Sequence, residues 1–122
     1  MHVRHKDQAE PITTSTGEVI YELVGRRVGR ATERHSGAHV VIPPGKSSRL
    51  HYHSEAEESY FILKGRGRLR VGDEEAEVGA GQMILIPAPL PHKIACAGAE
   101  DLELLAVSVP AWEPAGTVWL ED

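Results

Sequence analysis

Short runs of alternating apolar and polar residues dominate the chain, and they predict strands separated by turns. The clearest runs are 18–25 (EVIYELVG), 38–45 (AHVVIPPG), 82–87 (QMILIP) and 101–110 (DLELLAVSVP). Segment 82–87 is a continuous apolar strand, of the kind buried in a barrel wall. No stretch has the period of a long amphipathic helix, and the pattern therefore predicts an all-β domain.

The segment 66–78 (RGRLRVGDEEAEV) predicts a hairpin with a definite register. Gly72 and Asp73 suit a two-residue loop of type I′ or II′. The register that follows places three pairs opposite one another: Arg70 and Glu75, Arg68 and Glu77, Leu69 and Ala76. The arginines could form an anion-binding stripe, but glutamates at matching positions favour exposed cross-strand ion pairs of about 0.2–1 kcal/mol each.

Pattern and composition together divide the chain into three parts. Residues 1–17 are polar and predict an extended arm, 18–110 carry the strand pattern of the barrel, and 111–122 form a tail. Trp112 and Trp119 both fall in this tail. They could make a dimer contact or a pocket lid, or they could pack on the outer face of their own barrel, since tryptophan is common in both settings.

Two histidines one residue apart carry the clearest chemical signal. On a strand, His51 and His53 point to the same side, so both imidazoles can face one interior point. Glu58 follows after a short turn-like segment. Two imidazoles and a carboxylate suit a divalent transition metal such as Mn, Fe, Co, Ni, Cu or Zn. Ligation requires neutral imidazole and ionised carboxylate, so acid should remove the metal.

The spacing around these residues resembles the two signature motifs of the cupin superfamily. The first motif is matched at every fixed position, by Gly45, His51, His53, Glu58 and Gly65. The second motif is matched by Gly81, Pro87 and His92, while Pro89 stands in place of its glycine and Cys96 in place of its asparagine. These two departures concern the local turn, because neither position is a metal ligand in the family.

The resemblance implies a single double-stranded β-helix, or jelly-roll, barrel that holds one divalent transition metal ion per chain. The ligands it implies are His51, His53, Glu58 and His92. Glu58 is chosen over Glu57 because it keeps the six-residue interval to Gly65.

Three further residues are candidates for the wall of the pocket. Tyr60 has the strand parity of Glu58 and should face inward, and Arg49 lies beside the ligand-bearing strand. His39 is on a strand that often lines the pocket in the family. A lone histidine could equally be a half-buried side chain that is satisfied by a backbone group.

The resemblance also implies a function class. Small single-domain cupins suggest a metal-dependent enzyme, of isomerase, decarboxylase or dioxygenase type, that acts on a small organic or sugar-like molecule. The alternative is a non-catalytic small-molecule binding or sensor module with a structural metal. The resemblance to small single-barrel cupins, which are generally dimers, also implies an assembly. We therefore expect a homodimer in which residues 1–25 or the tail 112–119 cross to the partner.

Length, charge and composition narrow the domain count, the binding partners and the cellular location that we expect. A chain of 122 residues is long enough for one domain with its own core. The net charge of −5 argues against a nucleic-acid partner, and no apolar run approaches the roughly 20 residues that a membrane helix requires. The N-terminus lacks the apolar core of a signal peptide and Cys96 has no cysteine to pair with, so we expect a cytoplasmic protein.

Overall fold

The computed structural model describes residues 1–121, which form eleven strands and two short 3₁₀ helices. The strands are β1 (Ile12–Thr13), β2 (Val19–Val24), β3 (Ser36–Ile42), β4 (His51–His53), β5 (Glu57–Lys64), β6 (Arg66–Val71), β7 (Glu74–Gly79), β8 (Met83–Ile86), β9 (His92–Cys96), β10 (Leu102–Val109) and β11 (Thr117–Trp119). The helices are η1 (Lys6–Gln8) and η2 (Pro114–Gly116).

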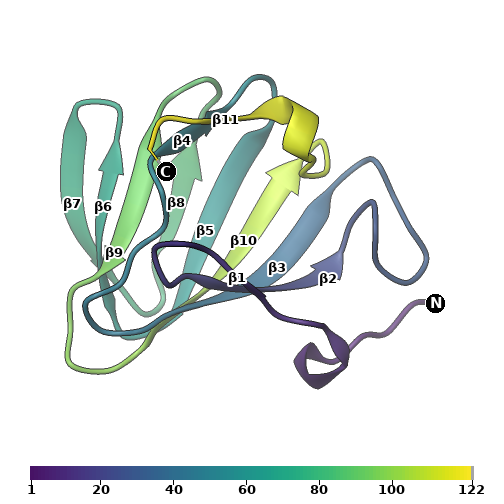
Figure 1. Cartoon of the computed structure of the whole chain (residues 1–122), viewed down its shortest axis with the longest axis horizontal. Coiled ribbons are helices and arrows are strands. Elements are labelled where there is room, and N and C mark those ends of the chain that lie inside the picture. The colour runs from purple at the N-terminus through teal and green to yellow at the C-terminus, as the bar shows by residue number, and fades with distance from the viewer. Residues whose placement is uncertain (122) are drawn as a thin grey trace.

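The strands build two antiparallel sheets that face each other (Figure 1). The six-stranded sheet has the order β1-β2-β3-β10-β5-β8, and the five-stranded sheet has the order β11-β4-β9-β6-β7. Consecutive strands such as β4 and β5 therefore lie in opposite sheets, as a jelly roll requires. The all-β double-stranded β-helix that the cupin resemblance implies is confirmed.

The core lies between the sheets and consists of the inward-facing side chains of both. Its most deeply buried members are aliphatic: Ile42, Ile62, Ile86, Ile94, Leu102 and Leu104. They come from five strands of the two sheets. The two from β10, Leu102 and Leu104, lie two positions apart, because alternate side chains of a strand share a face. Full burial of each aliphatic side chain contributes about 1.5–3 kcal/mol, so this cluster holds the two sheets together.

The prediction that 82–87 is buried in the barrel wall holds for one face of the strand only. In β8 only Ile84 and Ile86 face the core, whereas Met83 is 66% exposed and Leu85 is 57% exposed. The reason is that Met83 and Leu85 point to the outer face of the sheet, where Phe61 of the neighbouring β5 is also exposed. An apolar run alone does not distinguish this placement from a wall covered on both sides.

The hairpin of β6 and β7 has the predicted register, with Arg68 opposite Glu77 and Arg70 opposite Glu75. The ion pairs, however, run diagonally. Arg68 contacts Glu75 at 3.1 Å and Arg66 contacts Glu77 at 2.6 Å, while Arg70 donates to the carbonyl of Gly72. Long side chains reach diagonal neighbours as readily as direct ones, so the register was predictable but the pairing was not.

Both ends of the chain join the sheets. The segment 1–17, expected as an extended arm, contains η1 and also β1, which pairs with β2. At the other end β11 pairs with β4, so the tail adds an edge strand beside the two neighbouring histidines. Within residues 1–121, no helix is long and apolar enough to cross a membrane.

Candidate metal centre

Four buried side chains from both sheets meet at one point. His51 and His53 extend from β4, His92 from β9 and Glu58 from β5, and one ligand atom of each lies within 4.8 Å of all the others. His51 and His92 are direct neighbours across the β4–β9 pair. Glu58 reaches the same point from the opposite sheet, so the cluster forms only when the two sheets close. The structure brings together the four residues that the motif spacing indicates.

Backbone carbonyls orient two of the three imidazoles. Nδ1 of His51 donates to the carbonyl of Arg49 at 2.6 Å, and Nδ1 of His92 donates to the carbonyl of Leu90 at 3.0 Å. A carbonyl can only accept, so each Nδ1 carries the proton and each Nε2 keeps its lone pair. This is the tautomer that a metal requires when it binds through Nε2.

The third imidazole is oriented by the tail. Nδ1 of His53 lies 3.1 Å from Oγ1 of Thr117, and the Thr117 hydroxyl in turn donates to the carbonyl of Glu113 at 3.2 Å. Because the hydroxyl proton is used there, the oxygen accepts from His53. Thr117 is paired directly with His53 across β11 and β4, and it therefore fixes the same tautomer in this histidine.

The donor set fits a divalent transition ion. Nε2 of His53 is buried and has no hydrogen-bond partner among residues 1–121, although Oε1 of Glu58 lies 3.5 Å away. Nε2 of His92 lies 3.1 Å from the same carboxylate oxygen. A buried nitrogen without a partner is costly, and a metal would supply one. Three imidazole nitrogens and one carboxylate could therefore hold one metal ion.

Burial and mutual contact keep two of the ligands, His51 and Glu58, in the required protonation states. Burial and the neighbouring His92 lower the pKa of His51 to about 4, so its imidazole is neutral at pH 7. Burial alone would raise the pKa of Glu58, but its close contacts with the imidazoles of His53 and His92 outweigh it and lower this pKa to about 2. The carboxylate is therefore ionised at pH 7.

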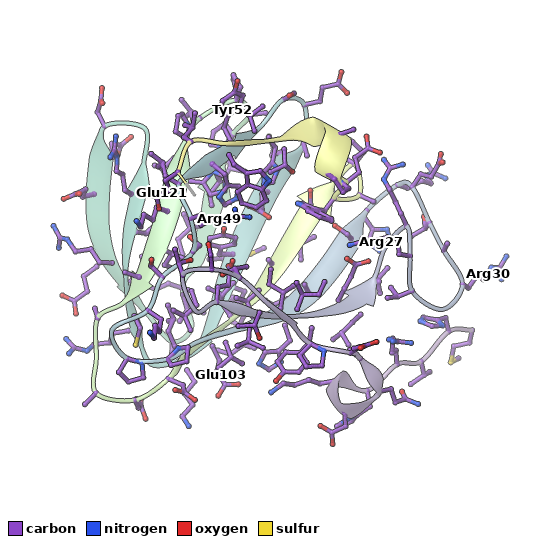
Figure 2. The ribbon with its side chains drawn as sticks, in the orientation of Figure 1. Arg27, Arg30, Arg49, Tyr52, Glu103 and Glu121 are labelled. Atoms are coloured by element: carbon purple, nitrogen blue, oxygen red, sulfur yellow. The ribbon has the colours of Figure 1, made fainter. Side chains whose placement is uncertain are left out.

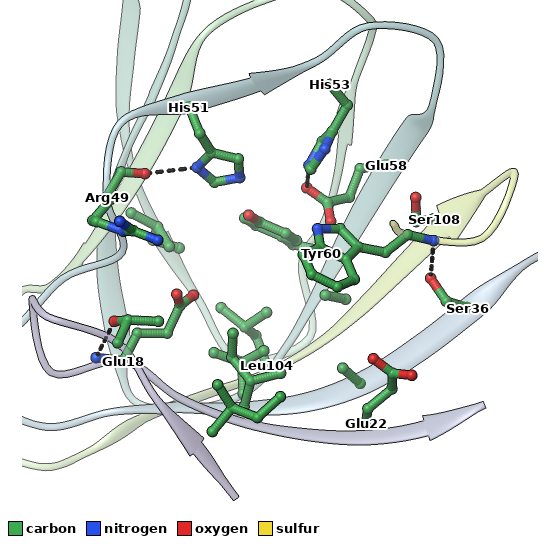
Figure 3. A pocket seen from close by; sticks show the side chains of 18 of the residues that line it. Glu18, Glu22, Ser36, Arg49, His51, His53, Glu58, Tyr60, Leu104 and Ser108 are labelled. Carbon is green, nitrogen blue, oxygen red and sulfur yellow. Dashed lines mark hydrogen bonds and ion pairs between the residues drawn. The ribbon is translucent and has the colours of Figure 1, made fainter. Parts of the chain in front are cut away.

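A cavity of about 250 Å³ opens beside the cluster (Figure 3). Of the predicted pocket residues, Tyr60 and Arg49 line it. Burial, together with the charges of Glu58 and Glu18, raises the pKa of Tyr60 well above its usual range, so the phenol keeps its proton. Tyr60 can thus donate a hydrogen bond at the metal end of the cavity.

His39, the third predicted pocket residue, does not line the cavity. Its Nε2 contacts Oε1 of Glu103 at 2.8 Å. Val40, the next residue along β3, is inward-facing and buried, so His39 is on the outer face of the sheet. Figure 2 shows Glu103 on the side of the molecule away from Arg49. A carboxylate rather than a backbone group satisfies this histidine.

The tail forms part of the cavity wall. Both Trp112 and Trp119 line the cavity. The ring of Trp119 lies 5.1 Å from the His51 ring, and the guanidinium of Arg49 lies 3.8 Å from the centre of the Trp119 ring. This contact is a cation–π interaction, and it holds Arg49 beside the metal centre.

Sequence reasoning missed two residues of the site, Glu18 and Thr117. Glu18 lines the cavity, and burial and the negative charge of Glu58, partly offset by Arg49, raise its pKa to about 7. Its strand parity with inward-facing Ile20 was the signal that could have found it. Thr117 gave no such signal, because its role depends on the pairing of the tail with β4.

Comparison with known proteins gives a matching family model and a relative that covers most of the chain. Residues 38–108 match a family model described as "Cupin domain". An uncharacterized protein of Methanocaldococcus jannaschii is 36% identical over 115 residues, which cover 94% of this chain and 91% of that protein.

Two further similarities concern proteins named for oxalate. An oxalate-binding protein of Thermotoga maritima is 35% identical over 72 residues, which cover 59% of this chain and 60% of that protein. The crystal structure of Lactobacillus farciminis oxalate decarboxylase in its formate complex superposes with a TM-score of 0.82 at 24% identity. That match covers 95% of this chain but only 35% of the decarboxylase, and it shows a shared fold.

Proposed function

This chain belongs to the cupin family, and on that basis we propose that it is a metal-dependent enzyme that acts on a small organic molecule. The observation that carries the proposal is the cavity beside the four convergent ligand side chains. A divalent ion held by His51, His53, Glu58 and His92 would supply Lewis acidity or a site for O₂.

The residues around the ligands have separate tasks in this proposal. Arg49 offers a positive charge that attracts an anionic substrate, and Trp119 holds it in place. The protonated phenol of Tyr60 donates a hydrogen bond to a substrate oxygen. Glu18, whose raised pKa lies near 7, can give or accept a proton within the cavity. Apolar walls exclude bulk water and strengthen each of these interactions.

Among the reaction classes that the cupin motifs imply, decarboxylation and dioxygenation suit this environment better than isomerisation of a sugar. The T. maritima relative carries a name that refers to oxalate, which supports an organic acid as the substrate. Arg49 supports the same choice, because a guanidinium recognises carboxylates.

A non-catalytic binding module is the second candidate. The name of the T. maritima relative refers to binding and not to turnover. In that case the same cavity holds an organic acid, and the metal orients this acid without catalysing a reaction.

The experiment that separates the two candidates is a turnover screen on protein that has been stripped and reloaded with single divalent ions. An enzyme releases CO₂ or consumes O₂ with at least one organic acid, and His53→Ala removes this activity. His39→Ala is the matched control, because it removes a histidine outside the cavity. Binding of acids without turnover under any metal would favour the binding module, and neither binding nor turnover would refute both.

We also propose that the chain forms a homodimer in which residues 1–25 or the tail 112–119 contact the partner. Small single-barrel cupins supply the precedent, and closed two-fold dimers are the commonest assembly of soluble chains.

A further inference from the structure

Three successive rows of side chains cross β3, β10 and β5 on the inner face of the six-stranded sheet. The row nearest the metal centre is Ser36, Ser108 and Glu58; the middle row is Ala38, Ala106 and Tyr60; the last of these three rows is Val40, Leu104 and Ile62. Each row follows from the strand register, and all three rows face the opposite sheet.

The cavity exists because the middle row contains two alanines. Ala38 and Ala106 are directly paired and leave open the space beside Tyr60. The floor of this space is aliphatic, with Val40 and Leu104 from the last row and Ile20 from β2. Figure 3 shows Leu104 across the cavity from His51 and His53. At about 250 Å³ the cavity has the volume of about eight water molecules in the liquid, more than a two-carbon acid fills.

The polar groups on the side of the cavity away from Arg49 already have partners in the protein. Ser108 donates to the carbonyl of Pro110 at 3.0 Å, and Ser36 accepts from the backbone of Trp112 at 2.9 Å. Glu22 is paired with Arg27. A sugar carries a hydroxyl on nearly every carbon and would find few free partners over this floor, so its desolvation would not be compensated.

The side of the cavity that Arg49 lines is charged. Arg49 forms no ion pair within residues 1–121, and its Nε is buried without a hydrogen-bond partner there. A divalent ion and Arg49 carry three positive charges against the single negative charge of Glu58 and at most one of Glu18, so this side has a net positive charge. A buried cationic end with an unused donor favours an anionic group.

We propose that the ligand is an amphipathic organic acid, with its carboxylate between Arg49 and the metal centre and an apolar body of about four to eight carbons over Ala38 and Ala106. This inference rests on the proposed function and narrows its substrate class. It separates the ligand of this chain from oxalate, which has no apolar carbon.

The test is a calorimetric titration of the metal-loaded full chain with acetate, butyrate, hexanoate and benzoate, with oxalate and glucose 6-phosphate for comparison. Burial of each added methylene should tighten binding about three- to fourfold from acetate to hexanoate. Benzoate should bind more tightly than acetate, and oxalate and glucose 6-phosphate should bind more weakly than hexanoate. Equal affinity along the series, or oxalate as the tightest ligand, would overturn the proposal.

Two variants locate the two ends of the ligand. Arg49→Gln should weaken every acid at least tenfold while keeping the dependence on chain length. Ala106→Leu fills the apolar end and should remove the advantage of hexanoate and benzoate while acetate binds as before. Circular dichroism and metal content identify a variant that is misfolded, and the series on the unmodified chain then decides alone.

The design keeps this inference separate from the proposed function. If the chain binds metal and turns over a short acid but affinity does not rise with chain length, the proposed function stands and the amphipathic ligand is wrong. If the chain takes up no metal, the proposed function fails. The dependence on chain length then still tests the apolar floor in the metal-free protein.

Discussion

At the level of single residues, the metal centre depends on which nitrogen of each imidazole carries the proton. Strand geometry predicted that His51 and His53 point to the same side, and the resemblance to the cupin motifs implied the full set of four ligands. Neither predicted Thr117, which holds His53 through its hydroxyl, because that contact joins residues 64 positions apart. A contact between residues so far apart in sequence leaves no local pattern that could predict it.

We predict that Thr117→Val weakens metal affinity about tenfold, because partners behind a ligating histidine typically contribute 10–100-fold. Valine has the shape of threonine but cannot accept the hydrogen bond from Nδ1 of His53. Thr117→Ser keeps the hydroxyl and should restore affinity to within about twofold. Competition with a coloured chelator measures both constants. Equal affinities of the valine and serine variants would show that the hydroxyl has no role.

Glu18 predicts a specific dependence of stability on pH in the metal-free protein. Its pKa is about 7 in the folded chain against an ordinary 4.5, so between these values the folded state binds more protons than the unfolded state. The free energy of unfolding therefore falls as pH rises from about 4.5 to 7. Glu18→Gln removes this fall and should raise the free energy of unfolding at pH 8, relative to pH 4.5, by about 1–3 kcal/mol.

Urea unfolding of chelator-treated protein at both pH values measures this difference. His51 and Glu58 titrate in both chains, so the comparison of variant with wild type isolates Glu18. Glu22→Gln is the control, since Glu22 also lines the cavity but is paired with Arg27. Parallel pH profiles for wild type and Glu18→Gln would contradict the raised pKa.

At the level of elements, local patterns predicted most strands and the hairpin register, but not which faces are covered. The two-residue loop at Gly72 and Asp73 is enough to predict the β6–β7 register without any tertiary contact. In contrast, Met83 and Leu85 are exposed because they lie on the outer face of the sheet with Phe61 of β5, and which face is covered depends on how the two sheets pack. The outward placement of His39 likewise depends on which face of β3 meets the opposite sheet.

Two motif glycines provide a matched test of turn geometry. Gly45 and Gly65 both have a φ of +79°, a conformation that costs other residues about 1–2 kcal/mol. A Cβ on Gly65 would also lie 2.5 Å from the carbonyl oxygen of Asp101, whereas a Cβ on Gly45 would meet nothing within 4 Å. We predict that Gly65→Ala lowers the free energy of unfolding by about 1–3 kcal/mol more than Gly45→Ala does. Equal losses in urea unfolding would exclude the steric contribution.

At the level of the whole molecule, the site is a product of two sheets closing on each other. The resemblance to cupins implied both the barrel and the ligand set, because its motifs specify residues that converge only in that fold. The cavity was not predictable, because it arises from the pairing of Ala38 with Ala106 across two strands far apart in sequence. Neither alanine has any signature of its own.

The proposed homodimer is a prediction at this scale. Light scattering at micromolar concentration should give twice the chain mass of 13.3 kDa. Deletion of residues 1–11, which precede β1, should shift the mass toward the monomer if the N-terminal segment makes the contact. A monomer mass for the full chain at this concentration would be inconsistent with the dimer.

The central claim is that His51, His53, Glu58 and His92 bind one divalent metal ion, and the metal content of the purified chain tests it most directly. Protein prepared without a nickel column, stripped and reloaded at neutral pH, should retain one equivalent of a transition metal by mass spectrometry. The metal content of the His51→Ala chain should fall close to zero. The His39→Ala chain, which lacks a histidine on the outer face, should keep the full equivalent of metal. A His51→Ala chain that still holds one equivalent, or a wild-type chain that holds none after reloading, would contradict the claim.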